Sequence, residues 1–374
     1  MGAFLLHTAL ALREENVAVR ALAPHAPNLA DEETLAGIPV HRFHYAPTRW
    51  EQIAYRGTMH EIVGRGLGGG ILFALFNLGF LGAALRQSVA IQPAILHAHW
   101  WIPGGVIGAC VAWATGVPLV ITTHGTDVEL LRQKRWAIPL ARFAFARARA
   151  VTCGSQYLRA QLLALDVVAP ARVHVIPMPI HSQFETPNPR RENPDFEILA
   201  VARLTAQKSL DTLIAAVALV RERGLAARVK IIGDGPARAE LQARADALNL
   251  QAAVTFLGTV SRAELLAHYA QCAVFVLPSI REGLGLVLAE ALLCGAPVVA
   301  ANSGGVTDIV RDGETGLLFA ERDARALADA LEKLWRDRAL AARLAATGAT
   351  WVRARFAGAA VAAQFAAVYQ TLAR

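Results

Sequence analysis

Paired cysteine motifs and the basic residues that open a secretory leader are both lacking from this chain of 374 residues. Its cysteines lie far apart, without the short spacings of a disulfide framework or a metal motif, and three of them fall in apolar runs: Cys110, Cys153, Cys272 and Cys294. We therefore expect reduced cysteines that pack in the core. The first residues carry none of the Lys and Arg that open a signal peptide, so the expected compartment is the cytoplasm.

Charged residues are also scarce, at 18% of the chain, whereas hydrophobic residues make up 55%. This composition excludes an intrinsically disordered protein, and the length predicts two domains. The net charge of +7 suits anionic partners such as nucleotides, phosphates or a bilayer surface. The basic residues are too few and too scattered to indicate nucleic-acid binding.

Two segments bear on membrane contact. The apolar stretch 71–85 is shorter than the roughly 20 residues that a membrane span needs, and Asn77 interrupts it, so we interpret it as a buried helix. The basic and aromatic segment 132–136, followed by Arg142, Arg147 and Arg149, has two interpretations. It forms either a solvated helix face or a contact with anionic lipid head groups.

Strands and helices alternate in both halves of the sequence. Strands are predicted in the first half at 17–22, 94–97, 118–122, 150–153 and 173–176, and in the second half at 196–201, 228–232, 254–257, 273–277 and 297–300. This alternation predicts two Rossmann-like domains, each a parallel sheet covered by helices. Within the second half, Ser261 and Glu264 match a helix capping box.

Prolines crowd one short polar stretch between the two halves, which predicts an interdomain linker. The expected division is a first domain over 1–178, a linker over 179–195 and a second domain over 196–350. A last helix within 351–374 is expected to pack back on the first domain.

The stretch from Glu282 to Glu290 reads as a loop with two glycines, Gly283 and Gly285, that leads into a helix near Leu286. Glycines let backbone amides approach a ligand, and the positive end of the helix would face the same place. We place Glu282 in the loop and Glu290 on the helix stripe beneath the anion. A diphosphate with a sugar at each end fits this pattern.

Other loops follow strands of the same predicted sheet. Arg203 and Lys208 lie after strand 196–201, just before a helix that begins near Ser209. The Gly233–Gly235 turn and Pro236 follow the next strand, and the segment 303–308 follows strand 297–300. Ligands of parallel α/β sheets bind outside the carboxyl ends of the strands, so these loops are expected to share one crevice.

Histidines lie at strand ends in the first half. His97 and His99 end one strand, and His124 and Asp127 follow another. No third ligand has suitable spacing and no Asp-x-Asp occurs, so we expect no metal. His124 either is a satisfied structural histidine or belongs, with Asp127, to a loop that recognises hydroxyl groups.

Taken together, these residues resemble the retaining GT-B glycosyltransferases of family 4, the glycogen-synthase-like or group 1 glycosyltransferases. The resemblance spans nearly the whole chain and implies two Rossmann-like domains that face a central cleft. It implies transfer of a sugar from a nucleoside diphosphate sugar to a saccharide or lipid-linked glycan, with retained anomeric configuration and without metal or cofactor. The resemblance also implies a role in polysaccharide biosynthesis for the cell envelope, at the inner face of an anionic membrane.

The resemblance also implies roles for individual residues. Arg203 and Lys208 would stabilise the leaving diphosphate, Glu282 would hold hydroxyls of the donor sugar, and Glu290 the ribose. His124 would line the reaction centre from the first domain. The other implied contacts are Gly233, Gly235, Pro236, Gly283, Gly285, Leu286 and Val287 for the donor, and Gly2, His99 and Asp127 for the acceptor.

The start of the chain departs from the family pattern. Such domains begin with a strand and a glycine-rich loop, whereas this sequence opens in a helix and keeps only Gly2 of that loop. We therefore expect the first strand to be missing and hypothesise a truncated gene model, which an in-frame upstream coding stretch would test. A non-catalytic nucleotide-sugar binder and a nucleotide-sugar 2-epimerase remain as alternatives, whereas the broken glycine fingerprint disfavours a dehydrogenase.

Overall fold

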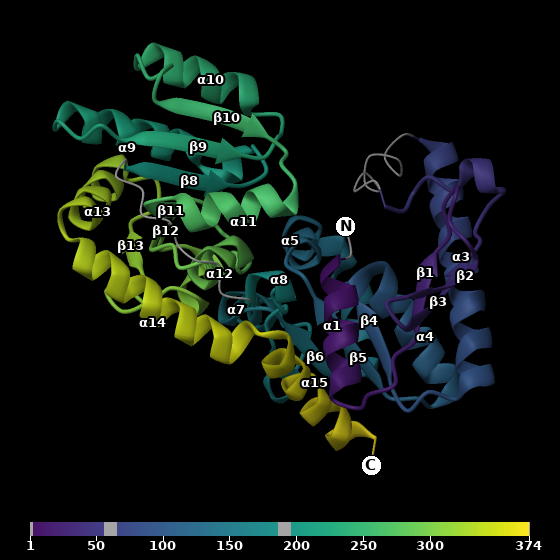
Figure 1. Ribbon diagram of the computed structural model, residues 1–374. Coiled ribbons are helices and arrows are strands. Elements are labelled where there is room, and N and C mark those ends of the chain that lie inside the picture. The colour runs from purple at the N-terminus through teal and green to yellow at the C-terminus, as the bar shows by residue number, and fades with distance from the viewer. Residues whose placement is uncertain (1–2, 56–65, 186–195, 374) are drawn as a thin grey trace. The chain divides into compact units, whose positions relative to one another are not determined.

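The computed structural model describes residues 3–55, 66–185 and 196–373 (Figure 1). The chain forms two compact units, the first made of Met1–Pro179 with Gly358–Arg374 and the second of Ile180–Ala357. Each unit is described by itself below.

A small sheet opens the first unit. Its strands are β1 (Ala21–Pro24), β2 (Glu32–Leu35) and β3 (Ile38–Phe43), in the order β1-β3-β2. β1 runs parallel to β3, and β2 runs antiparallel to it. The helix α3 (Leu67–Ile91) packs on this sheet through Phe76, whose ring meets that of Phe43 edge-on at 5.4 Å.

The first unit also contains a separate parallel sheet. Its strands, in spatial order, are β4 (Leu96–His99), β5 (Leu119–Thr123), β6 (Ala148–Cys153) and β7 (Val173–Val175). One face packs against α4 (Val106–Thr115), α5 (Thr126–Gln133), α6 (Ile138–Arg147) and α7 (Gln156–Ala164). The other face packs against α1 (Ala3–Glu14) and α15 (Gly358–Leu372), where Leu12 and Phe365 meet Val120.

The second unit contains a parallel sheet in the order β10-β9-β8-β11-β12-β13. The strands are β8 (Glu197–Val201), β9 (Arg228–Ile232), β10 (Val254–Gly258), β11 (Val274–Leu277), β12 (Val298–Ala301) and β13 (Leu317–Phe319). Neighbouring residues of β8 enter opposite cores, Ile198 on one face and Leu199 on the other. Strands buried on both faces are typical of parallel sheets.

Helices cover both faces of this sheet (Figure 1). The core around Ile198 is closed by α9 (Leu210–Glu222), α10 (Arg238–Ala247) and α13 (Ala324–Arg336). The core around Leu199 is closed by α8 (Ser182–Glu185), α11 (Arg262–Gln271), α12 (Leu286–Leu293) and α14 (Arg338–Phe356). The capping box of Ser261 and Glu264 at the start of α11 is confirmed.

Several sequence expectations are corrected by the structure. Strand 17–22 was expected in one sheet with the following strands, but β1 begins at Ala21 and lies in the small separate sheet. The expected helix 351–372 is two helices, because Ala357 has an extended conformation that ends α14 before α15 begins. Within the expected linker, Ile180 and Phe184 are buried in the second unit, while 186–195 lies outside the described residues.

The apolar stretch 71–85 is helical, as expected, but only partly buried. It lies within α3, whose 25 residues include exposed apolar side chains such as Ile71 and Leu78, 61% and 66% exposed. By length and composition α3 is the one helix among the described residues that could span a membrane, and 17% of its most apolar window is buried. An apolar helical pattern does not show what the helix packs against, and much of the apolar surface of α3 is left exposed by the residues that the structure describes.

Candidate functional site

Loops that follow four strands of the second unit meet at the carboxyl edge of its sheet. The amide of Ile280 donates to the carbonyl of Gln207 at 2.9 Å, and the amide of Arg281 donates to Ser303 Oγ at 2.6 Å. The amide of Leu204 donates to the carbonyl of Asp234 at 3.0 Å. These bonds join the loops after β8, β9, β11 and β12, which were expected to share one crevice.

Glycines allow the close approach of these loops. A Cβ on Gly233 would overlap the carbonyl oxygen of Ala202, and one on Gly304 would overlap that of Glu282. Gly285 has φ of 84° and precedes the first residue of α12. Substitution at these positions would therefore push the loops apart or strain the backbone.

Lys208 and Glu282 form an ion pair at this edge. Lys208 Nζ lies 2.6 Å from Glu282 Oε2, with side chains that are 21% and 14% exposed. Arg203, just after β8, is exposed and forms no ion pair with the described residues. α12 begins at Leu286, as predicted, so its first amides end in the same set of loops. The edge thus combines cations, one carboxylate and a helix N-terminus.

Glu290, on α12, lies deeper in the second unit. Its Oε2 accepts a hydrogen bond of 3.1 Å from the hydroxyl of Tyr269. Burial raises the pKa of Glu290 to about 7, so the carboxyl is only partly ionised at neutral pH. Its Oε1 has no hydrogen bond within the described residues, and that oxygen is available to a ligand.

The other residues that the resemblance assigns to the sugar donor lie in or next to these loops. Gly235 lies against the backbone of Leu204, and Pro236 lies in a turn before α10 begins at Arg238. A Cβ on Gly283 would meet nothing within 4 Å, so packing within the unit does not require a glycine there. Leu286 and Val287 form the first turn of α12.

Three histidines gather in the first unit at the ends of β4 and β5. His99 Nδ1 lies 3.0 Å from His124 Nε2, and His97 bonds Tyr369 and Thr122, each at 2.6 Å. Burial lowers the pKa of His97 to about 3 and that of His124 to about 4. The pKa of His99 is also lowered, so all three rings are neutral at pH 7.

Asp127, which the resemblance assigns to the acceptor side, forms its hydrogen bonds within its own unit. Its side chain is buried, and its two oxygens accept hydrogen bonds from the backbone amides of Trp101, His124 and Val128. Asp127 therefore positions the His124 loop. Gly2 lies outside the described residues.

Sequence reasoning missed residues that complete both regions. In the first unit, the rings of Phe4 and Trp100 lie 5.0 Å and 4.6 Å from that of His124. In the second, the hydroxyl of Tyr269 donates a hydrogen bond to Glu290. These partners lie far apart in sequence, and no spacing pattern marks them.

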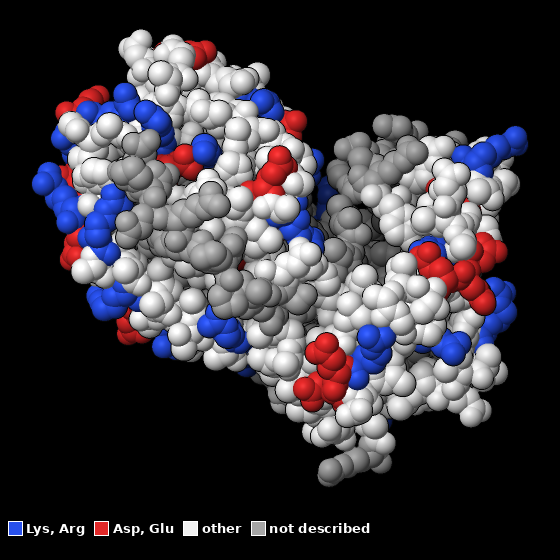
Figure 2. Space-filling model, viewed as in Figure 1, with Lys and Arg blue, Asp and Glu red and all other residues white. Residues whose placement is uncertain are grey.

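Cations and carboxylates are mixed elsewhere on the surface. On the face shown in Figure 2, lysine and arginine are interspersed with aspartate and glutamate over both units.

Two family models together match most of the chain. The model described as "Glycosyl transferase 4-like domain" matches residues 1–179, and "Glycosyl transferases group 1" matches residues 182–351. A GDP-mannose-dependent alpha-(1-6)-phosphatidylinositol monomannoside mannosyltransferase of Mycolicibacterium smegmatis is 32% identical over 270 residues. That alignment covers 67% of this chain and 69% of the relative.

Solved structures resemble the whole chain. Sucrose-phosphate synthase from Thermosynechococcus elongatus matches with a TM-score of 0.77 and 24% identity, covering 99% of this chain and 92% of the synthase. The catalytic domain of starch synthase IV from Arabidopsis thaliana, bound to ADP and acarbose, matches with a TM-score of 0.75 and 17% identity, covering 100% and 95%. These likenesses confirm the predicted α/β fold class.

Proposed function

Because the chain belongs to the group 1 glycosyl transferases and has the GT-B fold, we propose that it transfers a sugar with retention of the anomeric configuration. The donor is a nucleoside diphosphate sugar, and the acceptor is a hydroxyl of a saccharide or lipid-linked glycan. The observation that carries this proposal is the Lys208–Glu282 pair, which joins the loop after β8 to the loop that leads into α12.

The charges at this edge suit departure of a diphosphate. When the bond to the sugar breaks, negative charge develops on the leaving phosphate, and Arg203, Lys208 and the α12 amides would stabilise it. Lys208 Nζ donates to Glu282 Oε2 at 2.6 Å, and its ammonium has two further N–H groups that could face the phosphate. Glu282 would accept hydrogen bonds from hydroxyls of the donor sugar.

Glu290 would hold the ribose of the donor. Its free Oε1 can accept a hydrogen bond from a ribose hydroxyl when ionised, and the carboxyl can donate one when protonated. Its pKa of about 7 allows both states near neutral pH. Gly283, Gly285, Leu286 and Val287 would supply backbone contacts to the phosphates.

The histidine loop of the first unit would bind acceptor hydroxyls. His99 and His124 are neutral, and a neutral imidazole both donates and accepts hydrogen bonds. In the front-face mechanism that we propose, the departing phosphate oxygen itself takes the acceptor proton. This chemistry needs neither a catalytic metal nor a cofactor from the protein.

A peripheral contact with an anionic membrane would bring the enzyme to a lipid-linked acceptor on the cytoplasmic side. Trp136, in the basic segment 132–136, is 76% exposed, and Leu67 at the start of α3 is 89% exposed. Aromatic and apolar side chains beside cations favour a bilayer surface. The M. smegmatis relative is, by name, a transferase that acts on a phosphatidylinositol mannoside. Greater cosedimentation with anionic than with neutral vesicles is expected.

Donor turnover by the purified chain tests the proposed reaction. UDP, GDP and ADP would first be ranked by thermal shift, since a ligand at 100 times its Kd stabilises the folded state by about 2.7 kcal/mol. The sugars of the preferred nucleotide are then assayed for nucleotide release, and the anomeric configuration of the product is read by NMR. Addition of Mg²⁺ or Mn²⁺ should leave the rate unchanged.

Two outcomes contradict the proposal. Nucleotide binding without turnover of any donor would favour a non-catalytic nucleotide-sugar binder, and an inverted product would exclude retention.

A further inference from the structure

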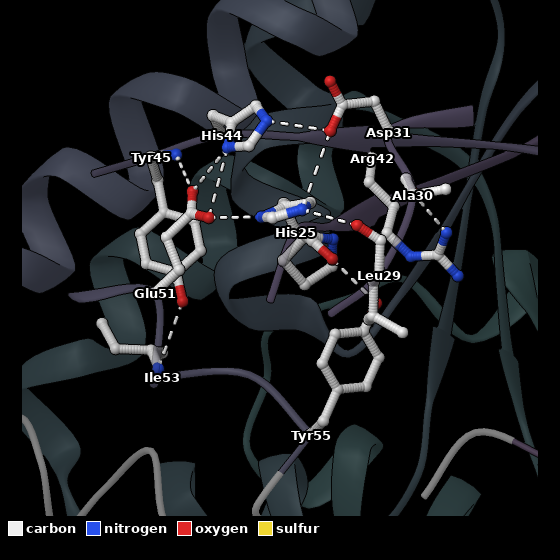
Figure 3. Close-up of polar contacts among 11 residues, drawn as sticks. His25, Leu29, Ala30, Asp31, Arg42, His44, Tyr45, Glu51, Ile53 and Tyr55 are labelled. Carbon is white, nitrogen blue, oxygen red and sulfur yellow. Dashed lines mark hydrogen bonds and ion pairs between the residues drawn. The ribbon is translucent and has the colours of Figure 1, made fainter. Parts of the chain in front are cut away.

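Three potential metal ligands converge at the edge of the small sheet in the first unit (Figure 3). His25 follows β1, His44 follows β3, and Glu51 follows the short turn Thr48–Trp50. β1 and β3 are parallel neighbours, so the residues after them meet, and the amide of His25 donates to the carbonyl of Phe43 at 2.9 Å. One ligand atom from each of the three side chains lies within 4.8 Å of the other two.

The carboxylate of Glu51 is buried beside histidines alone. Its side chain is 0% exposed, and that of His25 is 6% exposed. Among the described residues, Glu51 forms no ion pair with Lys or Arg. Its oxygens contact the amide of Tyr45 at 2.9 Å, His44 Nδ1 at 3.2 Å and His25 Nδ1. A buried carboxylate needs compensating positive charge, which must come from within this cluster.

The outer nitrogens of both histidines face oxygen acceptors. His25 Nε2 lies 2.8 Å from the carbonyl of Leu29, which can only accept, so this nitrogen carries a hydrogen. It also lies 3.7 Å from Asp31 Oδ1. His44 Nε2 lies 2.9 Å from the same Asp31 oxygen and donates to it. In their neutral forms, both histidines therefore direct the Nδ1 lone pair at Glu51, as Figure 3 shows.

Two lone pairs and a carboxylate that face one another repel unless positive charge lies between them. Either protons on both Nδ1 atoms or one metal ion would supply it. In metal sites, the histidine nitrogen that does not bind the metal typically donates a hydrogen bond to a carbonyl or carboxylate, and this bond orients the ring. The Nε2 atoms of His25 and His44 make contacts of this kind. Two histidines and one carboxylate are a ligand set that zinc favours.

We propose that His25 Nδ1, His44 Nδ1 and the Glu51 carboxylate bind a divalent transition-metal ion of the zinc class. The His44 side chain is 46% exposed, which gives the ion an entry path and leaves a fourth position for water. The bound ion ties the ends of β1 and β3 to the turn at Glu51. The site lies apart from the residues proposed for sugar transfer.

Metal content of the untagged full chain is the first test. After growth with zinc and extensive dialysis, mass spectrometry should find about one zinc per chain. Co²⁺ added to the chelator-stripped protein should give visible absorption of a tetrahedral site and raise the Tm. Absence of retained zinc, cobalt absorption and thermal shift together would overturn the proposal in favour of two protonated histidines.

Variants locate the site. H44Q removes the most exposed ligand, and the matched control H41Q changes a histidine on the neighbouring part of β3 whose Nδ1 faces Glu32. H44Q should lower cobalt affinity at least tenfold, whereas H41Q should leave it unchanged. D31N, which alters the carboxylate that faces the outer nitrogens of His44 and His25 at 2.9 Å and 3.7 Å, should lower affinity by about 10-fold to 100-fold. Equal cobalt binding by H44Q and H41Q would place the ion elsewhere and refute the assignment.

Discussion

In the second unit, Lys208 and Glu282 lie on loops at the carboxyl ends of strands, with part of each side chain exposed. In the first unit, His99 and His124 lie at the carboxyl ends of strands too, but burial lowers the pKa of both rings and keeps them neutral. The same topological position thus carries charge in one unit and uncharged hydrogen-bonding groups in the other. The difference fits a unit that binds a diphosphate and a unit that binds hydroxyl groups.

The stabilities of the two units are also expected to change in opposite directions as the pH changes. Histidines held neutral by burial stabilise the fold above their unfolded pKa and lose that contribution in acid. Glu290, whose pKa is raised to about 7, contributes most stability below its unfolded pKa and loses it as the pH rises.

The largest effect is expected from K208A. Loss of a preorganised cation facing the leaving diphosphate should lower kcat by about 100-fold to 1,000-fold. K230A is the matched control, because Lys230 Nζ pairs with Glu197 Oε2 at 2.8 Å on β9 and β8 of the same sheet, outside the loops of the site. Nucleotide-release assays should show the loss in K208A alone. Comparable losses in both variants would mean that stability, not the site, limits turnover.

The charged loops were predictable from sequence, because each follows a buried strand within a few residues. Arg203, Lys208 and Glu282 could be assigned to one edge once the parallel sheet was recognised, and Leu286 as the helix start followed from Gly285. The positions of partners could not be predicted in this way. Tyr269 on α11 contacts Glu290 on α12, and the two residues are not linked by a sequence pattern. The exposure of α3 depends on which other segments pack against it, which its own sequence does not show.

The first unit yielded less to sequence reasoning because its sites form by pairing of distant segments. His25 and His44 meet only because β1 pairs with β3, with β2 between them in the chain. The burial of Asp127 arises from amides on two separate segments. No spacing pattern encodes such contacts.

The first unit should lose stability in acid through His124. Its pKa falls from 6.5 to about 4, a difference of 2.5 units that corresponds to about 3 kcal/mol. This stability is present above pH 6.5 and is lost as the pH falls through 4. Amide hydrogen exchange in β5 and β6, corrected for intrinsic rates, should show weakening protection over this range. The H124Q variant should show a smaller change, and equal slopes would contradict the assignment.

The stability of the second unit should fall as the pH rises, because of Glu290. Its pKa rises from 4.5 to about 7, again a difference of 2.5 units. The corresponding change in the free energy of unfolding is at most about 3 kcal/mol, because the side chain is not fully buried. Protection of β11 and β12 should weaken as the pH rises from 4.5 through 7. E290Q cannot ionise and should flatten this dependence.

E264Q is the control of opposite sign for that experiment. The hydrogen bond with Ser261 lowers the pKa of Glu264, so its contribution is present at neutral pH and lost in acid. Loss of the rising-pH dependence in E264Q as well as in E290Q would show that Glu290 is not its source.

The smallest effect should come from Y269F, which removes the hydroxyl that donates to Glu290 Oε2. That hydrogen bond lowers the pKa of Glu290 against the larger effect of burial. A net contribution of about 1 kcal/mol corresponds to somewhat less than one pH unit, so the midpoint of the change in β11 and β12 should move upward by that amount. Protection at pH 5 should change little, because the carboxyl is protonated there in both proteins. A midpoint that stays in place would mean that the hydroxyl does not bind the ionised form, and Glu290 would then depend on a ligand for its remaining polar contact.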